Sequence, residues 1–98
     1  MEKYTLANVK SLLGKELKFK LPDTQEIWAA TVITVKESPI HGDEWEAFSM
    51  VIETEQVKFH PNDHYYFELQ HEVIGNPLLS CSPKSLSSVE FVYSRRRE

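Results

Sequence analysis

Residues 65–83 read YYFELQHEVIGNPLLSCSP and contain the pattern that decides the fold class. Every second residue from Tyr65 to Leu69 is apolar, which is typical of a β-strand with one buried face. A turn containing Gly75 follows, and the chain returns through an apolar run that stops at Pro83. The stretch therefore predicts a β-hairpin, with strands over 64–70 and 76–82.

The same two-residue period predicts four more strands, which are separated by turn residues such as proline and glycine. We expect them at 16–21, 26–36, 44–54 and 87–94. In the second of these, Ile27, Ile33 and Val35 are expected to face inward, and Trp28, Ala30 and Thr34 outward. Trp45 and Phe48 are out of phase for strict alternation, which predicts a bulge or a late strand start near Ala47.

The only good helix candidate covers residues 5–13. Thr5 is a suitable N-terminal cap, and Gly14 stands where a left-handed residue commonly ends a helix. The apolar face is expected to comprise Leu6, Val9, Leu12 and Leu13. Such a short helix is unstable alone, so we expect it to plug or flank the sheet.

These elements predict a mostly β (α+β) fold: a short N-terminal helix followed by about six antiparallel strands, each paired with its neighbour in sequence. Six twisted strands with one apolar face favour a small barrel or a curled two-layer roll. We expect one domain over 1–98, with the helix at about 5–13, the β-rich body at about 15–94 and a basic, solvated tail at 95–98.

The composition excludes several classes of function. The 98 residues carry a formal net charge of −4, which disfavours general nucleic-acid binding. The single cysteine, Cys81, allows no intramolecular disulfide and is expected to be buried and inert. The chain lacks a signal-peptide pattern and an apolar run of about 20 residues, so we expect a cytoplasmic protein without a membrane span.

Nearly the whole chain resembles a family of small bacterial domains whose function is unassigned. The resemblance lies in Phe48-Ser49-Met50-Val51, in Leu69 with His71, in Ile74-Gly75, in Leu78-Leu79 up to Pro83, in Phe91, and in Leu12-Leu13-Gly14 with Leu17, Phe19 and Leu21. Phe67 stands where that family usually has tyrosine. Members are often encoded beside phage-tail or tail-collar-like proteins, so the resemblance implies a structural or assembly role.

Four histidines raise the possibility of a metal or small-ligand site in the loops. Zinc requires three or four converging N, O or S ligands. The candidates are His41, Asp43, His60, Asp63 and His64, although their spacing matches no established ligand motif. His71 ends a strand, so with Gly75 it is expected to fix the following turn.

No catalytic motif or phosphate-binding loop is present in the sequence, and we expect neither an enzyme nor a cofactor. The acid pairs Glu44/Glu46 and Glu53/Glu55 are interpreted as solvated strand faces. Trp28 and Tyr66 fall on the faces assigned outward, where aromatic side chains can mark a contact surface. The leading hypothesis is therefore a non-enzymatic protein-interaction or assembly domain. A ligand- or metal-binding barrel is the alternative, and the sequence does not predict the partner or the oligomeric state.

Overall fold

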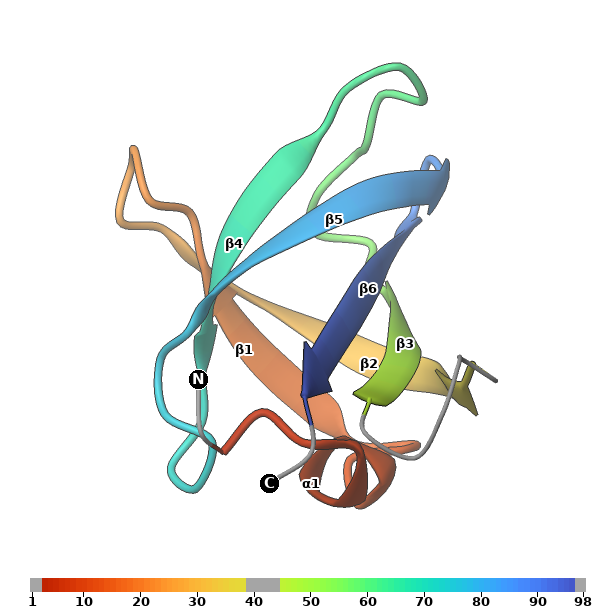
Figure 1. The fold of residues 1–98 in the computed structure, drawn as a ribbon. Helices are drawn as coiled ribbons and strands as arrows, with labels where there is room; N and C mark the ends of the chain where they lie inside the picture. Colours follow the sequence, from red (N-terminus) through yellow and green to blue (C-terminus); the bar gives the residue numbers. More distant parts are fainter. Residues whose placement is uncertain (1–2, 39–44, 97–98) are drawn as a thin grey trace.

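A computed structural model of the chain describes residues 3–38 and 45–96 (Figure 1). It contains one short helix and six strands, as the sequence predicts. The elements are α1 (Leu6–Lys10), β1 (Glu16–Lys20), β2 (Ile27–Glu37), β3 (Trp45–Glu53), β4 (Tyr65–Gln70), β5 (Leu78–Ser85) and β6 (Ser88–Arg96).

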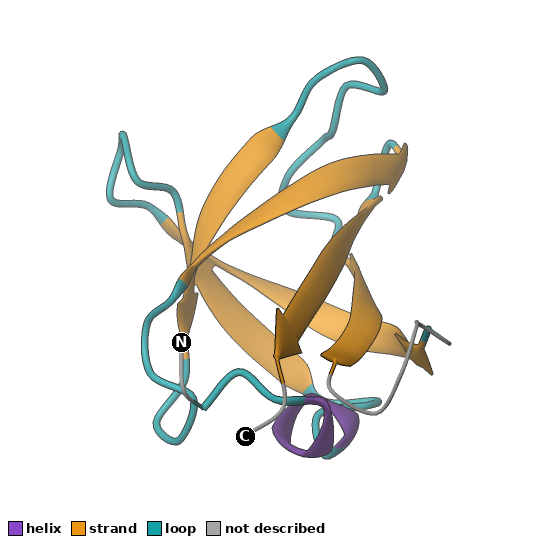
Figure 2. Cartoon of the chain, in the orientation of Figure 1, coloured by secondary structure: helices purple, strands orange, loops and turns teal. Residues whose placement is uncertain are grey.

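The six strands close into an antiparallel barrel in the order β1-β2-β3-β6-β5-β4. It consists of two three-stranded meanders, β1–β2–β3 and β4–β5–β6, joined edge to edge by the β3–β6 and β1–β4 pairs. The prediction that each strand pairs with its neighbour in sequence is therefore wrong at one step, because β3 and β4 do not pair. Their connection instead crosses an end of the barrel (Figure 2).

Helix α1 covers the opposite end and packs against β2 and β3 (Figure 1). Thr5 caps it by accepting a hydrogen bond from the Asn8 amide at 3.2 Å. The helix is shorter than the predicted 5–13: it ends at Lys10 with Ser11 as its C-terminal cap, and a turn follows in which Gly14 has φ +80°, the left-handed conformation that favours glycine. The buried face holds Leu6, Val9 and Leu12, whereas Leu13 is exposed and was wrongly assigned to it.

The facing of β2 before its bulge is the reverse of the prediction, whereas Val35 faces inward as predicted. Trp28, Ala30 and Val32 are buried, while Ile27 and Ile33 are exposed. Val32 pairs with Ile52 but Thr34 pairs with Val51, so Ile33 is an extra residue that forms a β-bulge. The bulge shifts the alternation by one position, and Val35 beyond it again packs on the core.

Three strand ends also differ from the prediction. β3 starts at Trp45 and keeps a regular register with β6, so both the bulge and the late strand start predicted near Ala47 were wrong. β5 continues through Pro83 to Ser85, with a register shift after the proline. β6 continues to Arg96, whose backbone pairs with Trp45, so the predicted tail starts too early; Arg97 lies outside the described residues.

Aromatic rings fill the barrel. Phe59, from the β3–β4 connection, is fully buried and packs with Trp28, Tyr65 and Phe67. Phe19 stacks between Trp28 and Phe91 at centroid distances of 5.0 and 5.5 Å. Val89 and Phe91 of β6 are buried in the same core.

Candidate functional site

The two predicted contact residues lie on opposite sides of the barrel wall. Tyr66 is 55% exposed, as expected, but Trp28 is only 5% exposed and belongs to the core. The error follows from the inverted facing of β2. Of the two, Tyr66 alone remains a candidate contact residue.

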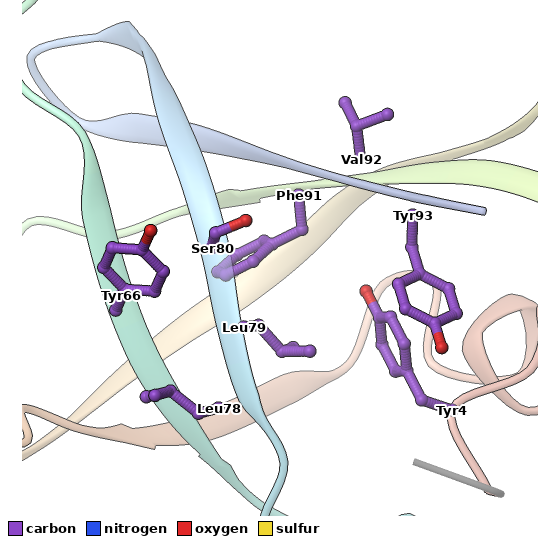
Figure 3. Close-up of a pocket in the computed structure, with 8 residues that line it drawn as sticks. All are labelled: Tyr4, Tyr66, Leu78, Leu79, Ser80, Phe91, Val92 and Tyr93. Atoms are coloured by element: carbon purple, nitrogen blue, oxygen red, sulfur yellow. The ribbon is translucent and has the colours of Figure 1, made fainter. Parts of the chain in front are cut away.

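Tyr66 borders a hollow between β5 and β6 that we name the β5–β6 slot (Figure 3). Its volume is about 270 Å³. Three large apolar side chains at its margin, Tyr66, Leu78 and Val92, are each more than half exposed. The complete lining is Tyr4, Tyr66, Leu78, Leu79, Ser80, Phe91, Val92 and Tyr93.

Tyr4 forms the floor of the slot. Its side chain is fully buried against Phe48 and Tyr93, with ring centroids 5.3 and 5.1 Å away. Figure 3 shows the hydroxyl directed into the space between Leu79 and Phe91. This hydroxyl has no hydrogen-bond partner among the described residues. Burial, with smaller contributions from Tyr93 and Cys81, raises the pKa of Tyr4, so the group remains a neutral donor.

The slot exists because β5 and β6 separate along their length. Their ladder comprises Ser82–Glu90, Pro83–Val89 and Ser85–Ser88. Within the described strands, Leu78–Cys81 and Phe91–Arg96 have no pairing with each other, and the two ribbons diverge in Figure 1. The barrel wall is therefore closed at one end of this seam and open at the other.

A second hollow lies on the other side of Tyr66 and Leu78. It has a volume of about 480 Å³ and includes Leu21 and Pro22 of the β1–β2 turn. The ring of His64 meets the ring of Tyr66 edge-on, with 5.4 Å between the centroids. Tyr66 and Leu78 thus form an apolar ridge between two depressions.

The structure does not assemble the predicted metal site from the residues it describes. His60, Asp63 and His64 are exposed, and no group of three or more His, Cys, Asp or Glu side chains in 3–38 and 45–96 could hold a metal ion. The Tyr65 hydroxyl instead accepts a hydrogen bond from the His60 amide at 3.0 Å. His41 and Asp43 lie outside the described residues.

The predicted turn at His71 is confirmed. Its Nδ1 atom accepts hydrogen bonds from the amides of Val73 and Ile74, both at 3.1 Å. His71 and Gly75 also exchange two backbone hydrogen bonds, of 3.1 and 2.9 Å. Gly75 has φ +89°, a conformation that favours glycine. The role of His71 in this geometry is to fix the corner between β4 and β5.

Cys81 is buried, as predicted, and burial raises the pKa of its thiol to about 12. Such a thiol is a poor nucleophile at neutral pH.

Glu53 and Glu55 are exposed, in agreement with a solvated face. Glu46 is half-buried and accepts a hydrogen bond from the Leu6 amide at 3.2 Å, which ties the start of α1 to β3; Glu44 lies outside the described residues.

Sequence reasoning missed Tyr4, Leu78 and Val92. Tyr4 directly precedes the helix cap, a position whose apolar side chain often packs back on the first turn, so it carried a usable signal. Consecutive leucines at 78 and 79 also meant that one of them had to face outward in a strand. Val92 carried a weaker signal of the same kind, because it lies between two inward aromatic residues.

Comparisons with protein-family models, curated proteins and solved structures found no match to this chain. Among the residues described, no helix has both the length and the apolar character needed to cross a membrane.

Proposed function

We propose that this domain is a non-enzymatic protein-interaction or assembly module whose contact surface is centred on Tyr66, Leu78 and Val92. The observation that carries this proposal is their arrangement: three large apolar side chains on adjacent strands β4, β5 and β6, each exposed, all bordering one hollow. Scattered single apolar residues are normal on a protein surface, but a group of them around a depression favours a binding site.

The chemistry of this surface suits a protein partner. Tyrosine supplies a large, semi-rigid apolar area with a polar tip, and it is enriched among the residues that dominate binding energy. Charged side chains are depleted in the cores of protein interfaces, and all the described residues that line the slot are uncharged. Charged residues lie beyond it, for example the Lys84–Glu90 ion pair at 3.7 Å. An apolar centre with a polar surround is the usual anatomy of an interface.

The family resemblance supports the assembly part of the proposal. It implies an accessory role near phage-tail or tail-collar-like proteins, and these are the first partners to test. The exposed apolar group supplies a physical means for such a role, since a surface of this kind loses unfavourable contact with water on association.

The test begins with capture of binding proteins from a lysate of the source organism, followed by calorimetric titration of each purified partner. Leu78→Asp places a charge at the centre of the contact surface and should weaken binding at least tenfold. Ile27→Asp is the matched control, because Ile27 is 61% exposed but lies on β2, across the barrel from β5. Equal affinities for the wild type and Leu78→Asp would contradict the proposed surface.

A further inference from the structure

We propose that the β5–β6 slot binds an uncharged, extended peptide segment of a partner protein, which pairs with the free edge of β6 and accepts a hydrogen bond from the Tyr4 hydroxyl. This inference rests on the proposed function and specifies the kind of partner that the surface takes.

Within the described strands, the backbone of β6 has one unpaired edge beside the slot. In an antiparallel strand, the N–H and C=O groups of one residue point to the same edge of the strand, and those of the next residue point to the opposite edge. On one edge, β6 is paired with β3 from Trp45–Arg96 to Glu53–Ser88. On the other edge, its pairing with β5 stops at Glu90, so alternate residues of Phe91–Arg96 direct N–H and C=O groups to an unpaired edge, and Phe91–Tyr93 of this edge line the slot. An extended peptide presents donors and acceptors at the matching spacing.

Tyr4 places a buried hydroxyl at the floor of the slot. A buried hydroxyl without a hydrogen bond lowers stability, so such groups are rare and call for an explanation. The Tyr4 hydroxyl is aimed into the slot, and it is a donor that needs an acceptor (Figure 3). A peptide carbonyl is an acceptor that every residue of a bound segment carries. A segment that enters the slot and uncovers the buried hydroxyl would bring one such carbonyl to it.

The lining and the size of the slot favour an uncharged, extended occupant. The described lining contains no charged side chain, so a charge buried there would have no partner. The volume of about 270 Å³ is small for a helix, whose diameter with side chains is about 10–12 Å. A strand inserts only every second side chain, and these can pack on Leu79 and Tyr93.

The experiment is a two-dimensional NMR titration of the isotope-labelled domain with the acetylated and amidated peptide Thr-Val-Thr-Val-Thr-Val, which is uncharged and favours the extended form. Amide shifts are expected in Phe91–Ser94 and in Leu78–Cys81. Tyr4→Phe keeps the ring but removes the donor, and it should weaken binding about 2- to 10-fold. Tyr65→Phe is the matched control, since its hydroxyl lies outside the slot lining and should not affect affinity.

Two methylated peptides test strand pairing directly. One carries N-methyl groups on all valines and the other on all threonines, so each has lost the donors of one edge. The peptide that has lost the N–H donors facing β6 should no longer bind, whereas the other peptide should still bind. Binding that survives both methylation patterns overturns the strand pairing.

Other occupants give different results. Shifts caused by benzamide but not by the peptide would overturn the proposal in favour of a small carbonyl ligand. If the amide signals of the slot residues shift as the protein concentration rises in the absence of peptide, a second copy of the chain occupies the slot and the proposal is overturned. A protein partner that is sensitive to Leu78→Asp, insensitive to Tyr4→Phe and not displaced by the peptide would leave the proposed function intact and overturn only this inference.

Discussion

The ring of Phe67 stands edge-on to the indole of Trp28, with 4.8 Å between the centroids and 78° between the ring planes. Phe67 comes from β4 and Trp28 from β2, the two strands that flank β1. Their contact therefore spans the inside of the barrel behind β1. Edge-to-face aromatic pairs of this kind contribute about 0.5–1.5 kcal/mol beyond the burial of their area.

Replacement of Phe67 by alanine should lower the free energy of unfolding by about 3–5 kcal/mol, because it opens a cavity among packed rings. Urea denaturation followed by tryptophan fluorescence measures the change. Tyr66→Ala is the control, since the neighbouring side chain is exposed and its loss should change stability by about 0.5 kcal/mol or less. A loss below about 1 kcal/mol for Phe67→Ala would contradict the packing described here.

His71→Ala should destabilise the domain by about 1–2 kcal/mol, because two backbone amides lose their acceptor. Hydrogen exchange at Val73 and Ile74 should accelerate. His71→Asn is the control: asparagine presents a side-chain oxygen that accepts from the same amides in turns of this kind, so much of the stability should return. Unchanged exchange at both amides in His71→Ala would rule out the turn-fixing role.

Tyr4→Phe should leave the free energy of unfolding unchanged or raise it by about 1 kcal/mol, because the lost hydroxyl is buried without a partner among the described residues. Tyr65→Phe makes the same chemical change where the hydroxyl accepts from the His60 amide, and it should cost about 0.5–1.5 kcal/mol. Thermal and urea unfolding of both variants provide the comparison. If Tyr4→Phe is the more destabilised of the two, the Tyr4 hydroxyl has a partner in solution.

The stability of the domain should fall at alkaline pH. Burial raises the pKa of Cys81 from 9.0 to about 12, so the folded state resists thiolate formation. This contribution is complete below the unfolded pKa and is lost as the pH rises from about 9 toward 12. Burial also raises the pKa of Tyr4, which adds a loss at higher pH. Urea titrations across this range should show a weaker pH dependence for Cys81→Ala than for the wild type, and identical slopes would refute the assignment.

The positions of the strands were predictable because alternation and turn residues are local signals. The facing of β2 was not, because its residues are apolar at both odd and even positions. Ile27, Ile33 and Val35 share one phase of the alternation, but the bulge at Ile33 means that only Val35 faces the core. A one-residue shift in a strand exchanges its buried and exposed sides, so this single irregularity explains the error at Trp28.

The candidate site was predictable only in part. Tyr66 could be assigned because its neighbours in β4 alternate cleanly. The slot depends on where the β5–β6 ladder stops and on Tyr4 reaching it from the far end of the sequence. Both are long-range relationships that no local pattern encodes.

The edge-to-edge joining of the two meanders also has a consequence for how the chain folds. Phe19 pairs with Leu69, and Phe48 with Tyr93, so both closing seams join residues about half the chain apart. The entropy of closing these long loops is lost before the seams contribute to stability. We therefore expect folding in milliseconds to seconds, with a transition state that already contains one closed seam.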